Sequence, residues 1–230
     1  MITKNRTILI FDLDDTLYKE LEFLKSAYKE IAICLSKETN VHFQVILNDM
    51  MVFYNSGLNA FKEILDAYGI QNICVDDLIS IYRNHKPQIS LKKPVKDMLF
   101  RLKQTVFKVG VITDGRSVQQ RNKIEALGLS DYFDDIIISE EFGSEKPNKA
   151  NYAYFENQYG GGMNYIYVGD NTHKDFLAPN ALGWHTICLL DDGHNIHKQS
   201  FELENSKLPK QCITHVLDLE FTINQVKHVL

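Results

Sequence analysis

The chain has 230 residues, of which 44% are hydrophobic and 24% are charged, and its net charge is −5. These values are close to the averages for globular proteins, which argues against a mainly disordered or a fibrous chain. The negative charge, without a dominant basic cluster, argues against a dedicated nucleic-acid-binding protein.

The beginning of the chain contains one short strand pattern. Residues 1–6 are polar, and residues 7–11 are a β-branched and apolar run that ends in acids, which predicts a buried strand. Five such residues are too few for the core of a signal peptide, and no apolar run in the sequence is long enough to span a membrane. The four cysteines are far apart and form no CxxC pair, as expected of reduced thiols. We therefore expect a cytoplasmic protein without a membrane partner.

The next part of the chain has a helical pattern. From Lys19 to Lys86 there are two glycines and no proline, and apolar residues recur at helical spacing. This pattern predicts a block of roughly 70 helical residues. The predicted helices cover about 19–36, 42–54, 58–68 and 75–85. Pro94 then begins a further helix.

From residue 106 onward, strand patterns alternate with helical patterns. The predicted strands are 106–112, 135–138, 164–168 and 186–189, with a further strand at 213–217. The predicted helices are 117–127, 148–159 and 174–182, with a final helix at 218–229. This alternation predicts a Rossmann-like α/β fold, in which a parallel sheet has helices on both faces.

The helical block interrupts the α/β pattern after its first strand. We therefore predict an α/β core domain from residues 1–17 and 93–230, and an all-helical domain from residues 18–92. Residues 191–212 fit no predicted element, and either a surface excursion or an association segment would explain them. A monomer and a homodimer are both compatible with the sequence.

Polar side chains follow several of the predicted strands. In an open parallel sheet, ligands bind beyond the carboxyl ends of the strands, so these side chains should meet in one site. The polar residues at or shortly after these ends include Asp12, Asp14, Thr113, Lys146 and Asp170. Crowded carboxylates raise each other's pKa, and a hard cation such as Mg²⁺ removes that repulsion. Acids together with a hydroxyl and a lysine are typical of phosphoryl transfer.

Four short motifs resemble, in order, those of the haloacid dehalogenase-like hydrolases. Residues 11–17 (FDLDDTL) resemble the first motif, DxDx[TV], and Thr113 at the end of VGVIT resembles the second. Lys146 in SEKP resembles the third motif, and GDNTHKD at 169–175 resembles the fourth. The resemblance covers roughly residues 7–190. The helical block lies between the first and second motifs, where this family carries a helical cap, so residues 18–92 should form that cap.

The resemblance implies a catalytic role for each matched residue. Asp12 would attack phosphorus and form an aspartyl-phosphate. Asp14 would protonate the leaving oxygen and then deprotonate the water that hydrolyses the intermediate. Thr113 and Lys146 would hold the phosphoryl oxygens. The backbone N–H groups that complete this cradle would be those near Leu13 and Asp114.

The resemblance also implies a Mg²⁺ site. The ion would be held by the carboxylates of Asp12 and Asp170 and by the backbone carbonyl of Asp14. Asp175 would orient the metal ligands or the motif lysine, with help from Asn171. Asp12 and Asp14 would share one face of a regular strand, so the chain must turn after Asp12 for the two to serve different steps.

The function that these motifs imply is that of a Mg²⁺-dependent phosphatase for a small phosphorylated metabolite. The cap would exclude water and limit substrate size, and the polar break at 55–59 would be either a substrate-selecting loop or an ordinary turn. A phosphomutase or another phosphoryl-transfer enzyme on the same core is the first alternative. A non-catalytic phospho-acceptor or interaction module is the second, although the intact motifs argue against it.

Overall fold

The core of the protein is a six-stranded sheet. The structure is a computed structural model that describes residues 6–226. The strand order is β3-β2-β1-β4-β5-β6, and every pair of neighbours is parallel. The strands are β1 (Thr7–Phe11), β2 (Lys108–Thr113), β3 (Asp135–Ile138), β4 (Asn164–Gly169), β5 (His185–Leu189) and β6 (Gln211–Ile213). The predicted parallel sheet is therefore confirmed, and β1, which carries the first motif, lies between β2 and β4.

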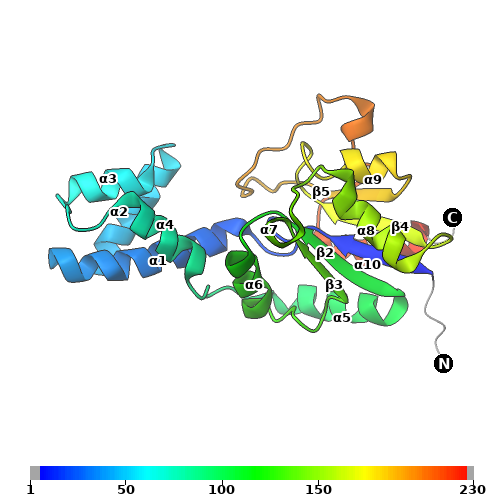
Figure 1. The fold of residues 1–230 in the computed structure, drawn as a ribbon, viewed down its shortest axis with the longest axis horizontal. Helices are drawn as coiled ribbons and strands as arrows, with labels where there is room; N and C mark the ends of the chain where they lie inside the picture. Colours follow the sequence, from blue (N-terminus) through cyan, green and yellow to red (C-terminus); the bar gives the residue numbers. More distant parts are fainter. Residues whose placement is uncertain (1–5, 227–230) are drawn as a thin grey trace.

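Helices cover both faces of this sheet, as predicted (Figure 1). Side chains alternate along β1, so Leu9 and Phe11 join one hydrophobic cluster while Ile8 and Ile10 join another on the opposite face. The helices of the core are α5 (Lys93–Thr105), α6 (Ser117–Ala126), α7 (Ser139–Phe142), α8 (Lys149–Tyr159), α9 (Leu177–Ala181) and α10 (Leu219–Val226). Two 3₁₀ turns are η1 (Asn205–Lys207) and η2 (Val216–Asp218).

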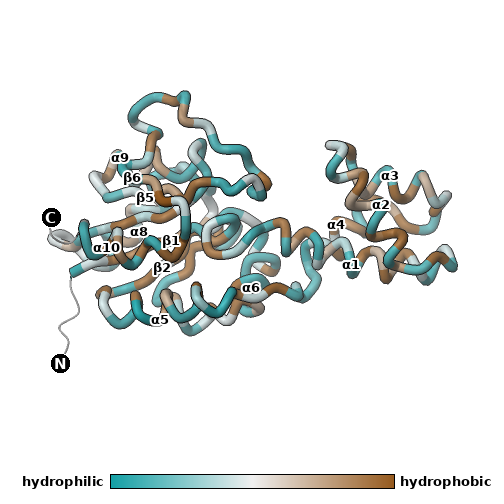
Figure 2. The backbone as a smooth tube through the Cα atoms, turned by 180° about the vertical axis from the view of Figure 1, so that it is seen from behind, coloured by the Kyte–Doolittle hydropathy of each residue, from teal (hydrophilic) through white to brown (hydrophobic). Residues whose placement is uncertain are grey.

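Four further helices pack together at one end of the molecule (Figure 1). They are α1 (Glu20–Thr39), α2 (Phe43–Asn55), α3 (Ala60–Ala67) and α4 (Val75–Asn84). Hydrophobic and hydrophilic residues alternate along their paths (Figure 2), as expected of helices with one buried face. Their buried faces form a third hydrophobic cluster, which includes Ile31, Ile46, Met50 and Ile64. The segments 12–19 and 85–92 connect this helical bundle with the sheet.

A long segment joins β5 to β6. It leaves the sheet at residue 190, extends toward the side of the helical bundle and returns through η1 (orange in Figure 1). Apart from η1, residues 190–210 have no regular secondary structure, which explains why they matched no strand or helix pattern. Gln211 and Cys212, which also matched no pattern, begin β6. A predicted strand at 213–217 is corrected to the short β6, which is followed by η2.

Several boundaries differ from the predicted ones. The strand predicted from residue 106 begins at Lys108, because Val106 is the C-cap of α5. The helix predicted at 174–182 begins at Leu177, because residues 171–176 form a turn. The final helix is described to Val226, and the remainder of the predicted 218–229 lies outside the described residues. All four cysteines are free, and no helix in the described part of the chain is long and apolar enough to cross a membrane.

The close packing of α8 on the sheet leads to a prediction at Gly110. A Cβ at this position would lie 2.6 Å from Cζ of Phe155 and even closer to Cε1, and the ring is fully buried. Overpacking of this kind costs about 1–3 kcal/mol. We expect Gly110→Ala to lower the free energy of unfolding in urea by that amount. Gly161→Ala is the control, because its Cβ would meet nothing within 4 Å; equal stabilities of the two variants would contradict the prediction.

Candidate functional site

The chain turns directly after β1. The N–H of Asp12 still donates to the carbonyl of Val168 (2.8 Å), so Asp12 continues the pairing of β1 with β4. Asp15 then has a φ of 54°, a left-handed conformation in which Asp and Asn are more common than most other residues. The turn sends the side chains of Asp12 and Asp14 to different lysines, Lys146 and Lys123. The turn expected between the two aspartates is therefore present.

Asp12 belongs to a buried ionic cluster. The Nζ of Lys146 donates to Asp12 Oδ1 at 2.6 Å and to Asp175 Oδ1 at 2.8 Å, and the hydroxyl of Tyr167 also donates to Asp175 (3.0 Å). Asp12, Lys146 and Asp175 are each at most 6% exposed. Burial alone would lower the pKa of Lys146, but the two carboxylates raise it well above its usual value. The lysine is therefore a fixed positive charge beside Asp12.

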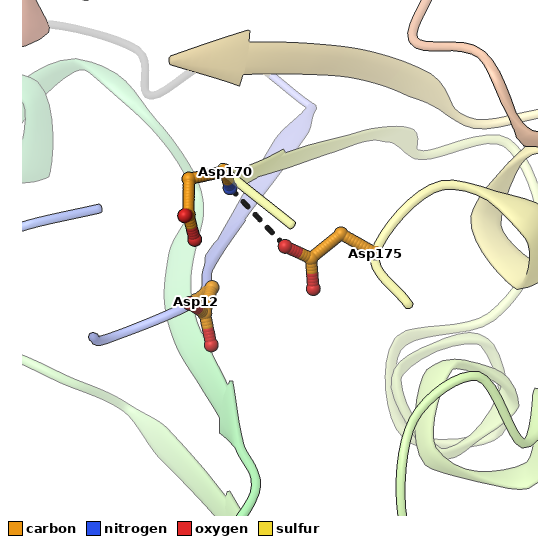
Figure 3. Close-up of side chains that lie close together, drawn as sticks. All are labelled: Asp12, Asp170 and Asp175. Carbon is orange, nitrogen blue, oxygen red and sulfur yellow. Dashed lines mark hydrogen bonds between the residues drawn. The ribbon is translucent and has the colours of Figure 1, made fainter. Parts of the chain in front are cut away.

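Asp170 lies next to this cluster at the end of β4. Figure 3 shows its carboxylate beside that of Asp12, whereas the carboxylate of Asp175 is turned toward the main chain of Asp170. Asp175 Oδ2 accepts the N–H groups of Asp170 (3.1 Å) and Asn171 (2.8 Å). Asp175 therefore fixes both the lysine and the loop that carries Asp170.

These carboxylates could hold a metal ion. One oxygen from each of Asp12, Asp170 and Asp175 lies within 4.8 Å of the others. Burial, partly offset by Lys146, raises the pKa of Asp12 to about 8. Burial and the charge of Asp12 raise that of Asp170 to about 9. A hard divalent cation would relieve this repulsion and prefers oxygen ligands. Both oxygens of Asp175 accept hydrogen bonds of 2.8–3.1 Å. Asp12 Oδ2 and Asp170 Oδ1 instead share a single hydroxyl, that of Thr16, at 3.4 Å, so Asp12 and Asp170 are the carboxylates available to the cation.

Asp14 has a separate set of partners, mostly on α6. Both of its oxygens accept from the Nζ of Lys123 at 2.8 Å, and Gln120 (3.0 Å) and the hydroxyl of Tyr18 (2.5 Å) donate to it as well. Burial raises the pKa of Asp14, but the charge and hydrogen bond of Lys123 and the other donors outweigh it, and the pKa is lowered. Lys123 is 1% exposed and also contacts Glu20 (3.4 Å). The structure therefore favours an ionised Asp14.

The remaining residues proposed from the motifs surround these two groups. Thr113 ends β2 and its hydroxyl accepts a hydrogen bond from Gln120. Asp114 accepts the N–H of Lys146 (3.0 Å) and the Nζ of Lys174 (3.3 Å), so it fixes the position of the loop that carries the motif lysine. The side chain of Leu13 is fully buried in the core, which leaves its backbone for the site.

A cavity of about 260 Å³ brings most of these residues together. Its lining contains seven carboxylates and two lysines, so it is strongly acidic. The residues that line it are Asp12, Asp14, Asp15, Glu20, Thr113, Asp114, Gly115, Glu145, Lys146, Asp170, Asn171, Lys174 and His197. Of the site residues proposed from the sequence, all line this cavity except Leu13 and Asp175.

Four important residues were missed by the sequence analysis. Gln120 and Lys123 are three residues apart, so a helix places them on the same side. That spacing alone does not show that their helix faces Asp14. Asn195, which donates to Asp170 at 2.8 Å, and His197 lie in the segment without a predicted element. No pattern in the sequence brings that segment to the site.

Comparisons with known proteins identify relatives of the whole chain. A family model described as haloacid dehalogenase-like hydrolase matches residues 9–189. A glyceraldehyde 3-phosphate phosphatase of Methanocaldococcus jannaschii is 32% identical over 195 residues, which cover 79% of this chain and 84% of that protein. The pyrimidine 5'-nucleotidase YjjG of Escherichia coli is 28% identical over 195 residues, which cover 81% and 86%.

Solved structures show the same fold. The putative HAD-hydrolase YfnB of Bacillus subtilis, solved with bound magnesium, aligns with a TM-score of 0.66 at 20% identity, covering 96% of this chain and 100% of that one. A 2-haloacid dehalogenase of Pseudomonas syringae aligns with a TM-score of 0.63 at 20% identity, covering 96% and 99%. At these identities the likeness concerns the fold.

The raised pKa values of Asp12 (about 8) and Asp170 (about 9) make cation binding depend on pH. In the cation-free protein the folded state binds these protons more tightly than the unfolded chain, so stability falls as the pH rises from about 4 to about 9. A cation must displace the same protons, so its affinity increases over this range. We expect Mg²⁺ or Mn²⁺ to raise Tm more at about pH 9 than at about pH 6.

Differential scanning fluorimetry with and without the cation measures this difference. Asp170→Asn should largely remove the cation-dependent rise in Tm at both pH values, because the variant lacks one of the two available carboxylates. A rise that is equal at both pH values in the unaltered protein would contradict the prediction.

Proposed function

This chain belongs to the haloacid dehalogenase-like hydrolase family, and from that premise we propose that it is a Mg²⁺-dependent phosphatase for a small phosphomonoester. The observation that carries the proposal is the arrangement of the two aspartates of the first motif. Asp12 is paired with Lys146 and lies beside Asp170, whereas Asp14 is paired with Lys123. Both aspartates line the same cavity. One carboxylate is thus placed to attack phosphorus and the other to move a proton.

The first chemical step forms a covalent intermediate. A carboxylate oxygen of Asp12 attacks phosphorus, the new O–P bond forms, and the P–O bond to the leaving group breaks. The leaving oxygen takes a proton from the carboxyl group of Asp14. Lys146 and Thr113 hold the phosphoryl oxygens, and Lys146 also fixes one oxygen of Asp12 at 2.6 Å. When bound by Asp12 and Asp170, Mg²⁺ would supply positive charge against these oxygens.

The second step releases phosphate and restores Asp12. A water attacks phosphorus of the aspartyl-phosphate, and Asp14 takes the proton of that water. The ion pair with Lys123 favours the ionised form of Asp14, which is the form this step needs. The preceding step needs the protonated form, so the side chain of Asp14 must then face the leaving oxygen rather than Lys123.

We propose that residues 18–92 act as a cap and that residues 1–17 and 93–230 form the catalytic core. The four cap helices have their own hydrophobic cluster and join the core through two segments. Such a unit can move as a body over the cavity and exclude water. Interdomain movement is described for the magnesium-bound structure of YfnB, which supports this proposal.

The cap contains a group of four aromatic rings. The rings of Tyr28, Tyr54, Phe61 and Tyr82 contact one another at centroid distances of 5.7–6.5 Å. Burial raises the pKa of both Tyr54 and Tyr82, and the carboxylate of Glu20, which lines the cavity, contributes to both shifts. We propose that the hydroxyl groups of Tyr54 and Tyr82 bind the leaving group of the substrate.

The charges of the cavity define the substrate class further. Lys146 is bound by two carboxylates and Lys174 by Asp114, so an anionic leaving group would find acids and no uncommitted lysine in the described lining. We propose a substrate whose only anionic group is its phosphate and whose remainder is uncharged and hydroxylated. Glyceraldehyde 3-phosphate, named for several relatives, is of this class.

The first test is turnover of p-nitrophenyl phosphate and of glyceraldehyde 3-phosphate, measured as release of inorganic phosphate. We expect Mg²⁺-dependent turnover that EDTA abolishes, and a fall of about 1,000-fold or more for Asp12→Asn, because the variant lacks the attacking carboxylate. Asp131→Asn is the control, since Asp131 is exposed and outside the cavity. Turnover that survives in Asp12→Asn would contradict the mechanism. A product that keeps its phosphate would point to a mutase.

The second test concerns the cap hydroxyls. Each neutral hydrogen bond contributes about 0.5–1.5 kcal/mol, so we expect Tyr54→Phe or Tyr82→Phe to raise KM for glyceraldehyde 3-phosphate roughly 3- to 10-fold. The KM for p-nitrophenyl phosphate should stay unchanged, because its leaving group offers no aliphatic hydroxyl. Tyr68→Phe is the matched control: its hydroxyl binds Asp49 (2.7 Å) within the cap. Equal changes for both substrates would argue against leaving-group recognition.

A further inference from the structure

Residues 191–199, the loop that follows β5, are held in place by their own hydrogen bonds. Asp191 Oδ1 accepts three backbone N–H groups, from Gly193 (2.8 Å), His194 (3.0 Å) and Asn195 (3.0 Å). At the other end of the loop, Gln199 donates to the carbonyl of Leu189 at 2.8 Å. This closed turn fixes the backbone from which the side chain of Asn195 projects.

The amide of Asn195 connects two charged groups. Its Nδ2 donates to Asp170 Oδ2 at 2.8 Å, and its Oδ1 accepts from the Nζ of Lys19 at 2.7 Å. A lysine ammonium can only donate and a carboxylate can only accept, so these partners determine which way the amide points. Lys19 is fixed in turn by Asp192 at 2.7 Å. The amide therefore has a single favourable orientation.

The same loop also contacts the backbone of the site and the cap. Gln199 donates to the carbonyl of Asp170 (2.7 Å), and the N–H of Ile196 donates to Asp15 (2.9 Å) in the first motif. The side chain of Ile196 packs against the hydrophobic cluster of the cap helices. Lys19 is the N-cap residue of α1, the first cap helix. The loop thus lies between Asp170 and the segment through which the cap joins the core.

We propose that Asn195 is a positioning residue, which holds Asp170 in the orientation that binds the metal ion and depends on Lys19 for its own orientation. Asn195 occupies Oδ2 of Asp170 at 2.8 Å, whereas Oδ1 has only the hydroxyl of Thr16 at 3.4 Å, so Oδ1 is the oxygen more available to a cation. Without the amide, the carboxylate of Asp170 could rotate. Each binding event would then have to fix its orientation, which would weaken the affinity for the ion. This inference rests on the proposed Mg²⁺-dependent function, but it concerns the affinity for the ion rather than the chemistry.

Metal binding to the full-length protein, measured by isothermal titration calorimetry with MgCl₂ alone, tests the inference. Loss of a partner that orients a metal ligand typically weakens metal affinity about 10- to 100-fold. We expect Asn195→Leu, which keeps the size but not the hydrogen bonds, to raise the Kd for Mg²⁺ by that factor. At saturating Mg²⁺ its kcat should stay within about threefold of the unaltered protein. Lys198→Ala, at an exposed position three residues further along the loop, should leave the Kd for Mg²⁺ unchanged.

A double-mutant cycle tests the part played by Lys19. If Lys19 acts through Asn195, Lys19→Met should raise the Kd for Mg²⁺ by a smaller factor, and the double variant should be no weaker than Asn195→Leu. Additive effects in the cycle would overturn the role of Lys19. A Mg²⁺ Kd in Asn195→Leu equal to that of the unaltered protein would overturn the proposal.

The failure of this inference differs from the failure of the proposed function. If the unaltered protein binds Mg²⁺ and hydrolyses phosphomonoesters while Asn195→Leu binds the ion equally well, only the positioning role is wrong. If the unaltered protein shows no Mg²⁺-dependent hydrolysis, the proposed function is wrong. Should Asn195→Leu fail to fold, Asn195→Ser removes the amide with a smaller, polar side chain and is measured in the same way.

Discussion

The desolvation of carboxylates at the ends of the parallel strands is the constraint on which the site depends. Asp12, Asp170 and Asp175 are each at most 6% exposed, and one carboxylate oxygen of each lies within 4.8 Å of the others. Charges buried in this way are tolerated only when they are paired and hydrogen-bonded. One buried lysine, Lys146, supplies the pairing from the protein. Three carboxylates face this one lysine, and a divalent cation would balance the remaining negative charge.

A second buried lysine gives the two aspartates of the first motif opposite properties. The pKa of Asp12 is raised to about 8, chiefly by burial, whereas the pKa of Asp14 is lowered, because Lys123 and two further donors outweigh its burial. The residues are two positions apart in the sequence, so their difference arises from the turn at Asp15 and from the orientation of α6. Paired acids whose surroundings separate their pKa values are typical of sites that divide catalytic work.

Much of this organisation could be predicted from the sequence. The parallel sheet followed from the alternation of strand and helix patterns, and the family from the four motifs at the strand ends. Lys123 and Asn195 could not be found in this way. The role of Lys123 depends on which face of α6 turns toward the first motif, and the role of Asn195 depends on the path of an irregular loop. Neither the orientation of the helix nor the path of the loop leaves a periodic pattern in the sequence. Local patterns predict elements, but contacts between distant elements depend on packing.

The separate hydrophobic cluster of the helical bundle has a consequence for how this protein could diversify. Its buried residues, such as Ile31, Met50 and Ile64, pack among themselves rather than into the two clusters beside the sheet. Substitutions within the bundle can therefore accumulate without disturbing the strands that carry Asp12 and Asp170. Over evolutionary time, a lineage can change the surface of the bundle while it inherits the same carboxylate cluster at the strand ends.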